Sequence, residues 1–234
     1  MVDIAANLER VRELVERHAG RVGRDAAEIT LVAITKTVPP QRIQQAYDLG
    51  LRQFGENRVQ EAANKMGALP EDIRWHMVGH LQRNKVKLAL GLFDIIHSLD
   101  SPRLAAALER RAGAAGRVVP VLVEVNVGGE ESKYGFRVET AEGKEEFLRT
   151  VEEVLETKHL CLQGLMTLAP IVADPEEARP YFQRLWELRE ELKQRFPQGD
   201  WKHLSMGMTD DYPTAIEEGA TIIRLGRAIF GERK

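Results

Sequence analysis

Residues 118–127 read V-V-P-V-L-V-E-V-N-V, the longest nearly continuous apolar run in the chain. Valine dominates it, and a strand that is apolar on both sides is typical of a parallel sheet covered by helices on both faces. Helical patterns flank the run, at residues 102–115 before it and 143–156 after it. The segment therefore predicts a β/α unit within a larger parallel sheet.

The same alternation of a short apolar run and a helical pattern continues along the whole chain. Eight strands are predicted, at residues 30–35, 52–57, 74–79, 93–100, 118–127, 160–167, 202–206 and 221–226. An amphipathic helix over residues 3–19 precedes the first of them. Eight such units favour a closed (β/α)8 barrel of the TIM type over an open doubly wound sheet. The first strand is not followed by G-x-G-x-x-G, which weakens the dinucleotide-binding alternative.

Length and charge narrow the class of protein. Because α/β barrels of ~250 residues fold without dividing, we expect residues 1–234 to form a single domain. The 36 acidic and 33 basic side chains are well mixed, so no broad positive field would attract nucleic acid or an anionic membrane. No apolar segment has the length of a membrane span or a signal peptide, which predicts a cytoplasmic protein.

Reactive groups of α/β barrels lie at the carboxyl ends of the strands. Polar residues occupy nearly all of these positions here: Lys36, Asn57, His80, Ser98, Asn126, Thr167, Ser205 and Arg224. So many polar ends converging on one mouth predict a site for a polar ligand. Tyr134, in the loop after the fifth strand, could cover this mouth or simply pack.

Lys36 carries the most reactive of these side chains. It directly follows the buried run A-I-T, where desolvation or a neighbouring cation would lower its pKa from the usual ~10.4. A neutral amine is what imine formation with an aldehyde requires. A solvated lysine at a strand end is the alternative, and the residue alone does not decide between them.

The last two strands predict a phosphate site. Barrels often bind phosphate with the loops after strands seven and eight and the amino terminus of a short helix. These segments read L-S-M-G-M-T (204–209) and R-L-G-R-A-I-F-G (224–231). Gly207 and Gly226 would let backbone N–H groups approach an anion, and Ser205 adds a hydroxyl.

Two arginines flank this predicted phosphate site. Arg224 ends the last strand inside the mouth, where an unpaired guanidinium is costly, so it should face an acceptor. That acceptor could be a ligand or a structural carboxylate. Arg227 is expected to contribute its backbone N–H rather than its side chain.

The histidines do not predict a metal site. His76 and His80 lie four residues apart, but in a strand and its following loop rather than on one helical face. No third ligand is evident beside them. His97 and His203 lie inside strands and are expected to be core residues.

Motifs along the chain resemble those of the pyridoxal phosphate homeostasis proteins, which share the barrel of the alanine racemase amino-terminal domain. The resemblance covers almost the whole chain in order. It rests on L-V-A-I-T-K-T (31–37), F-G-E-N-R-V-Q-E (54–61), W-H-M-V-G-H-L-Q-R-N-K (75–85), S-K-Y-G-F (132–136), L-S-M-G-M-T-D-D (204–211) and I-R-L-G-R-A-I-F-G (223–231).

This resemblance implies that the cofactor is pyridoxal 5'-phosphate, bound as an imine on Lys36. Its phosphate would be held by Ser205 and by the backbone around Gly226 and Arg227. Family members usually read G-T-A-I-F-G, so only a backbone role carries over to Arg227.

The same resemblance implies the contacts of the cofactor ring. Arg224 would meet the pyridine nitrogen, and Asn57, His80 and Met206 would line the ring and its substituents. A fixed cation opposite that nitrogen disfavours its protonation and weakens the ring as an electron sink. Such an arrangement suits holding the cofactor better than carbanion chemistry.

A non-enzymatic carrier is the function that the resemblance implies. It would be a cytoplasmic monomer in vitamin B6 homeostasis that buffers pyridoxal phosphate and passes it transiently to apo-enzymes. Racemases of the related fold add a carboxyl-terminal β domain with a tyrosine base, which we expect to be missing because the chain ends at Lys234. A small pyridoxal-phosphate-dependent amino acid racemase or lyase stays open as an alternative, and so, more weakly, does a phosphosugar aldolase or isomerase.

Overall fold

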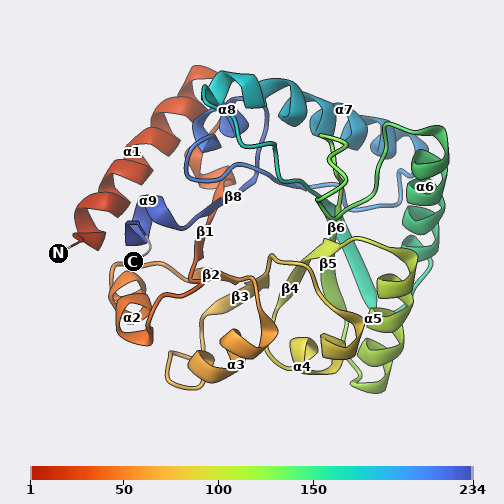
Figure 1. The fold of residues 1–234 in the computed structure, drawn as a ribbon, viewed down its shortest axis with the longest axis horizontal. Helices are drawn as coiled ribbons and strands as arrows, with labels where there is room; N and C mark the ends of the chain where they lie inside the picture. Colours follow the sequence, from red (N-terminus) through yellow and green to blue (C-terminus); the bar gives the residue numbers. More distant parts are fainter. Residues whose placement is uncertain (1, 233–234) are drawn as a thin grey trace.

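A closed barrel of parallel strands forms the centre of the molecule (Figure 1). The structure is a computed structural model and describes residues 2–232. Within these residues the strands are β1 (Thr30–Ile34), β2 (Gln53–Glu56), β3 (Arg74–Met77), β4 (Ile95–Leu99), β5 (Val119–Glu124), β6 (Leu160–Met166), β7 (His203–Ser205) and β8 (Ile222–Leu225). Each pairs with the next in sequence, and β8 closes the barrel against β1. The prediction of a TIM-type barrel and of its strands is confirmed.

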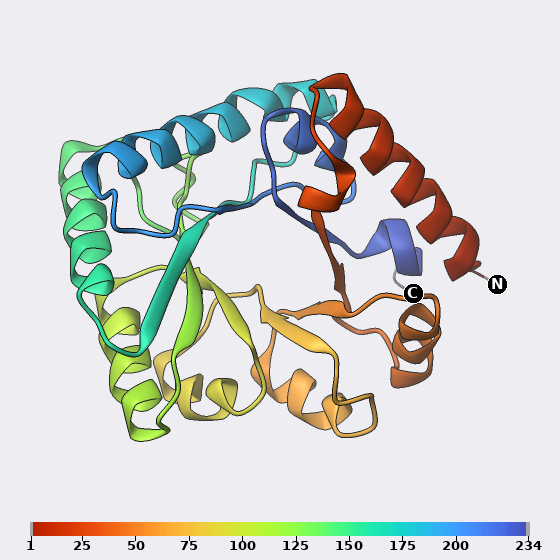
Figure 2. The same ribbon diagram turned by 180° about the vertical axis from the view of Figure 1, so that it is seen from behind.

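Helices connect the strands and cover the outside of the barrel (Figures 1 and 2). They are α1 (Ile4–Arg21), α2 (Pro40–Asp48), α3 (Val59–Met66), α4 (Val86–Leu90), α5 (Pro102–Ala114), α6 (Ala141–Leu155), α7 (Arg179–Arg195), α8 (Tyr212–Glu217) and α9 (Arg227–Phe230). Short 3-10 turns add η1 (Ala26–Glu28), η2 (Arg83–Lys85) and η3 (Pro175–Ala178). The predicted helix before the first strand is α1, and its cap is Asp3, which accepts the Ala6 N–H at 3.0 Å. No helix within residues 2–232 is long and apolar enough to cross a membrane.

Side chains alternate between two cores along each strand. In β1, Val32 and Ile34 belong to the cluster inside the barrel, whereas Ala33 packs in the larger cluster between strands and helices. In β5, Leu122 points inward by the same rule. A residue that lies two positions beyond an inward residue is therefore directed toward the barrel mouth.

A chain of buried hydrogen bonds crosses the barrel interior below that mouth. His76 bonds Gln53 Oε1 and His97 at 2.8 Å each, His97 bonds Ser205 Oγ at 2.9 Å, and Arg224 donates to the same Oγ at 2.5 Å. Burial lowers the pKa of His76 to about 3 and that of His97 well below its ordinary value, so both rings are neutral. Each ring then donates once and accepts once, and the chain holds Arg224 in place. The prediction that His97 is a core residue is confirmed, while His203 is half-buried.

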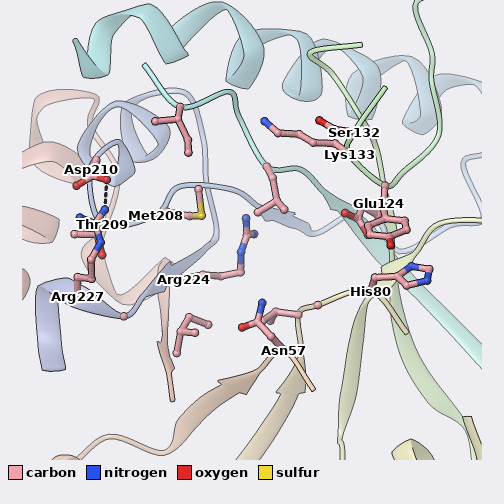
Figure 3. Close-up of a pocket in the computed structure, with 17 residues that line it drawn as sticks. Asn57, His80, Glu124, Ser132, Lys133, Met208, Thr209, Asp210, Arg224 and Arg227 are labelled. Atoms are coloured by element: carbon pink, nitrogen blue, oxygen red, sulfur yellow. Dashed lines mark hydrogen bonds and ion pairs between the residues drawn. The ribbon is translucent and has the colours of Figure 1, made fainter. Parts of the chain in front are cut away.

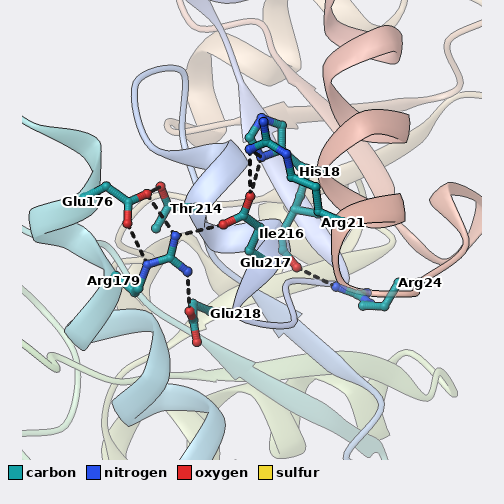
Figure 4. A network of polar contacts seen from close by, with 9 residues as sticks. All are labelled: His18, Arg21, Arg24, Glu176, Arg179, Thr214, Ile216, Glu217 and Glu218. Carbon is teal, nitrogen blue, oxygen red and sulfur yellow. Dashed lines mark hydrogen bonds and ion pairs between the residues drawn. The ribbon is translucent and has the colours of Figure 1, made fainter.

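An ion-pair network ties α1 to α7 and α8 (Figure 4). Glu217 binds Arg179 at 2.8 Å and His18 at 2.7 Å, and Arg179 also pairs with Glu176 and Glu218. The hydrogen bond from Arg179 holds the pKa of Glu217 at about 2, so its carboxylate stays charged at neutral pH. The first helix is thus fixed against the last β/α units of the barrel.

Candidate functional site

A cavity of about 460 Å³ opens where the strands end at their carboxyl termini (Figure 3). Its volume lies within the range of small-molecule sites. Ile34, Val78 and Leu168 give it an apolar part, and Arg224 reaches it from β8. Among residues 2–232 no group of three or more His, Cys, Asp or Glu side chains is arranged to hold a metal ion. The cavity is thus suited to an organic ligand that is partly apolar and partly polar.

Several residues predicted from the sequence meet at this cavity. The predicted residues that line it are Asn57, His80, Arg224, Gly226 and Arg227. They come from the loops that follow β2, β3 and β8, from the last position but one of β8, and from the first residue of α9. The structure therefore brings these five together, as the convergence of strand ends predicts.

Lys36 lies on the same rim but does not form part of the cavity wall. It is half-buried, and it follows by two positions the inward Ile34, which does line the cavity. Within residues 2–232 its side chain makes no hydrogen bond or ion pair. Ile34 is also the neighbour of Gly226, since a Cβ placed on that glycine would lie 3.6 Å from Ile34 Cβ. An amine at position 36 and the turn at Gly226 thus occupy adjacent strand ends.

The backbone on either side of Lys36 is held by side chains of α3. Thr37 is the one non-glycine residue with a positive φ in the described chain, at 64°. A left-handed conformation at a threonine is strained and needs support from its surroundings. The Thr37 N–H donates to Glu61 at 2.5 Å, and Lys65 Nζ donates to the Thr35 carbonyl at 2.8 Å.

A buried carboxylate completes this support behind β1 and β2. Glu56 is fully buried, pairs with Lys65 at 2.6 Å and accepts the Thr35 hydroxyl. Burial raises the pKa of Glu56, and the contacts with Lys65 and Thr35 oppose that rise. These residues are not evident from the sequence, because a lysine and two glutamates in a strand and a helix are typical of an ordinary solvated surface.

The opposite end of the cavity is built by the turns after β7 and β8. Figure 3 shows Thr209, Asp210 and Arg227 gathered there. Thr209 Oγ1 accepts the Ala228 N–H at 3.3 Å, and the Arg227 guanidinium pairs with Asp210 and, at 3.3 Å, with Glu232. The Arg227 side chain is therefore paired with two carboxylates, and a contact between its backbone N–H and a phosphate stays a prediction.

Glycine at position 226 is not required by the protein itself. Its φ is −109°, and an added Cβ would meet its nearest atoms at an ordinary 3.6 Å. Gly207 is different, because its φ is +94° and a Cβ would lie 2.7 Å from Ala215 Cβ. The fold itself has room for a Cβ at position 226. A glycine there therefore leaves space on the cavity side for a ligand that comes close to the backbone.

Gly226→Ala is therefore expected to leave folding nearly unchanged and to weaken phosphate-bearing ligands. A methyl group against a tightly held ligand costs about 1–3 kcal/mol, which corresponds to roughly 5- to 150-fold in Kd. Gly207→Ala is the matched control, and strain should lower its unfolding free energy by about 2 kcal/mol or more. Urea unfolding and titration with pyridoxal phosphate separate the two effects. Unchanged affinity in Gly226→Ala would remove Gly226 from the site.

Besides Lys36, two predicted residues do not line the cavity. Ser205 is fully buried below it, with its hydroxyl engaged by His97 and Arg224. Met206 points the other way and packs in the core between strands and helices, and Met208 lines the cavity in its place. Ser205 can therefore act on a ligand through Arg224, and its direct contact with a phosphate stays a prediction.

The strand-end residues Asn126 and Thr167 also serve the fold. The Asn126 amide donates to Glu130 O at 2.8 Å and so shapes the loop after β5. The Thr167 hydroxyl donates to Val125 O at 2.6 Å, and Ser98 is fully buried. A polar residue at a strand end is thus only a candidate until its partners are known.

A third part of the cavity is aromatic and acidic. His80 stacks on Tyr134 with ring centroids 3.8 Å apart, and its Nδ1 meets Asp100 Oδ2 at 2.6 Å. Tyr134 does lie at the mouth, the first of the two possibilities open from the sequence. Glu124 also lines the cavity beside them. From the sequence it was expected only as part of an apolar strand. Its two-residue spacing from the inward Leu122 is the signal that could have identified it.

Comparison with known families gives a match along nearly all of the chain. A model of the family described as "Alanine racemase, N-terminal domain" matches residues 3–234. The chain is 47% identical over 228 residues to the pyridoxal phosphate homeostasis protein of Aquifex aeolicus, which covers 97% of both proteins. It is 38% identical over 243 residues to the protein of the same name from Escherichia coli, covering 100% of this chain and 98% of that one.

A solved structure gives the same result for the fold. The structure of PipY from Synechococcus elongatus with pyridoxal phosphate bound has a TM-score of 0.80 and 36% identity to this chain. The match covers 93% of this chain and 100% of PipY. A relative of the same fold and size thus holds this cofactor.

Proposed function

This chain belongs to the family of pyridoxal phosphate homeostasis proteins, and from that premise we propose that it binds pyridoxal 5'-phosphate in the barrel mouth and carries it without catalysing a reaction. The observation that carries the proposal is the composition of one rim. The carboxyl ends of the adjacent strands β1 and β8 bring together three groups there. They are the amine of Lys36, the buried guanidinium of Arg224, and Gly226, a glycine that the fold does not require. These are the three groups that an aldehyde, a pyridine nitrogen and a phosphate need.

In this proposal Lys36 holds the cofactor aldehyde as an imine. Lys36 lies two positions after the cavity-lining Ile34, or about 6.6 Å along an extended chain, which a lysine side chain can span, so a change of rotamer would bring the amine to the cavity. Because no described residue pairs with this amine, such a movement breaks no hydrogen bond or ion pair within residues 2–232. The supports on Thr35 and Thr37 keep the backbone from moving with it.

The phosphate is placed at the turns after β7 and β8. Gly226 allows the close approach, and the backbone N–H groups around Arg227 are directed to the same end. Asp210 would repel an anion there, and its ion pair with Arg227 offsets that repulsion. We therefore assign to Arg227 a backbone contact and a screening role.

Arg224 is assigned to the pyridine nitrogen, with Asn57 and His80 beside the ring. Burial lowers the pKa of Arg224 to about 10, so the guanidinium remains charged at neutral pH. It donates to Ser205 at 2.5 Å and to Thr167 O at 2.7 Å, which fixes its orientation. A cation held there keeps the pyridine nitrogen unprotonated and limits the electron-withdrawing chemistry that the bound cofactor can supply.

This electronic setting supports a carrier. The chain would act as a cytoplasmic monomer that lowers free pyridoxal phosphate and hands it to apo-enzymes in transient encounters. A small amino acid racemase or lyase stays as the alternative, since Glu124 is a carboxyl at the cavity with a pKa raised by burial to about 8 and could transfer protons.

An exchange experiment discriminates between these two functions. The loaded protein is incubated with single amino acids in deuterated water, and α-deuterium incorporation and chirality are followed. We expect turnover well below ~1 per second, the lower end of ordinary enzyme rates. In parallel, the loaded protein should restore activity to an added apo-aminotransferase. Turnover at or above that rate would overturn the carrier proposal in favour of the enzyme.

A further inference from the structure

Glu124 is an acceptor without a partner at the cavity. It ends β5 with only 5% of its surface exposed, and it lines the cavity. Among residues 2–232 its Oε2 atom is buried without any hydrogen-bond partner. A buried carboxyl left unsatisfied is costly, so its partner is expected to arrive with a ligand.

The nearby cations are committed elsewhere. Arg224 directs its hydrogen bonds to Ser205 and the Thr167 carbonyl. Lys133 pairs with Glu130 at 2.5 Å and donates to the Ala169 carbonyl at 3.1 Å. On the far side of the cavity, Arg227 is paired with Asp210 and Glu232. Among the described Lys and Arg residues that line the cavity, none is therefore left to pair with Glu124, and in the proposed function the amine of Lys36 is engaged in the imine.

Other groups around Glu124 make its surroundings acidic and aromatic. Burial and then the charge of Asp100 raise the pKa of Glu124, and only Arg224 opposes them. The Phe136 N–H donates to the Glu124 carbonyl at 2.9 Å, so the loop that carries Tyr134 packs on this strand end. Tyr134 and His80 form a stacked pair, and Figure 3 shows His80 beside Glu124. A carboxyl next to an aromatic face suits an alkylammonium group.

We propose that Glu124, Tyr134 and the His80–Asp100 pair form a subsite for an incoming primary amine, and that the Glu124 carboxyl carries protons from the incoming nitrogen to the departing one. This inference rests on the proposed function, because the amine displaces Lys36 from the imine. The amine nitrogen forms a bond to the imine carbon, and the bond from that carbon to Lys36 Nζ breaks. The two N–H protons of the incoming amine pass through the Glu124 carboxyl to Lys36 Nζ, so one primary amine enters, another is released, and no oxidation occurs.

The charges of the subsite define the class of amine. An α-amino acid would bring a carboxylate close to Glu124 and Asp100, where no unpaired cation could receive it. An amine on an apolar stem carries no such group. The preferred ligand is therefore an alkylamine or the side chain of a lysine in a protein that accepts the cofactor, and not a free amino acid.

Exchange kinetics test this subsite. The protein is loaded with pyridoxal phosphate, and the loss of the Lys36 imine is followed by absorbance and borohydride trapping after addition of butylamine, Nα-acetyl-lysine amide or alanine. At equal concentrations of free amine, butylamine and the lysine derivative should react at least about tenfold faster than alanine. Glu124→Gln should slow both by roughly 100-fold, the usual scale of one acid-base group, and remove an inflection from the pH profile.

Glu187→Gln, a substitution of an exposed glutamate on α7, is the matched control and should match the unsubstituted protein. Equal rates for butylamine and alanine in the unsubstituted protein would overturn the subsite, whether or not Glu124→Gln folds. An unchanged rate in a loaded Glu124→Gln would also overturn it and leave the cofactor proposal standing. Failure of the unsubstituted protein to form an imine would overturn both.

Discussion

Protein carrying Lys36→Ala is expected to stay colourless in pyridoxal phosphate, whereas the unsubstituted protein turns yellow. The substitution removes the one amine that β1 presents at the rim, and no other covalent anchor is assigned to the cofactor. The Lys36 side chain has no hydrogen-bond or ion-pair partner among residues 2–232. The unfolding free energy of the protein should therefore change by no more than about 0.5 kcal/mol. Visible absorbance after gel filtration and urea unfolding are the measurements.

Lys87→Ala is the matched control for this prediction. Lys87 is exposed on α4, outside the cavity lining, and its substitution should leave both colour and stability unchanged. A Lys36→Ala protein with full imine absorbance would show that another lysine is the anchor. Loss of colour together with unfolding would instead assign Lys36 to the fold.

Lys65→Met is expected to destabilise the protein by about 3–5 kcal/mol, the usual cost of leaving one member of a buried ion pair without its partner. Glu56 is fully buried and would keep its carboxyl without a cation, and the Thr35 carbonyl would lose a donor. Since Thr35 directly precedes Lys36, imine formation should slow as well. Urea unfolding measures the first effect, and stopped-flow absorbance measures the second.

Two further variants make this prediction specific. Lys193→Met removes an exposed lysine that pairs with Glu190 at 2.9 Å, and it should cost less than about 1 kcal/mol. The double variant Glu56→Gln/Lys65→Met should recover part of the lost stability, because an amide is cheaper to bury than an unpaired charge. Equal losses for Lys65→Met and Lys193→Met would contradict the role of the buried pair.

Most of the fold was predictable because one physical signal repeats along it. Each strand is a short apolar run covered on both faces, each helix is amphipathic, and the connections between them are short, so position and type follow from local pattern. For example, β1 was expected at residues 30–35 and spans Thr30–Ile34. Such agreement is possible because a barrel is built from neighbouring units, and each unit already contains its own pattern.

The site was only partly predictable, because side-chain direction and partners depend on the closed barrel. The two-residue period of a strand points Ser205 into the barrel and Met206 away from it. The two residues therefore cannot both face the cofactor site. The hydroxyl of Ser205 is hydrogen-bonded to His97, which lies on another strand and is far away in sequence. Glu124 was overlooked because a single acid in an apolar run does not disturb the pattern of a strand.

The supports of Lys36 show the same limit. Lys65 belongs to α3 and reaches the Thr35 carbonyl only because β2 brings that helix against β1. Neither the motif around Lys36 nor the helix pattern indicates this contact. The strained Thr37 is likewise visible only in the backbone angles. The sequence motifs point to Lys36, and the tertiary structure shows what holds its backbone.

Borohydride trapping followed by peptide mapping tests the central claim most directly. Freshly purified protein is incubated with pyridoxal phosphate, reduced, digested and analysed by mass spectrometry. The account predicts loss of the yellow colour on reduction and one pyridoxyl phosphate group per chain, located on the peptide that contains Lys36. A label on another lysine such as Lys133, or no covalent label in a protein that still binds the cofactor, would contradict it.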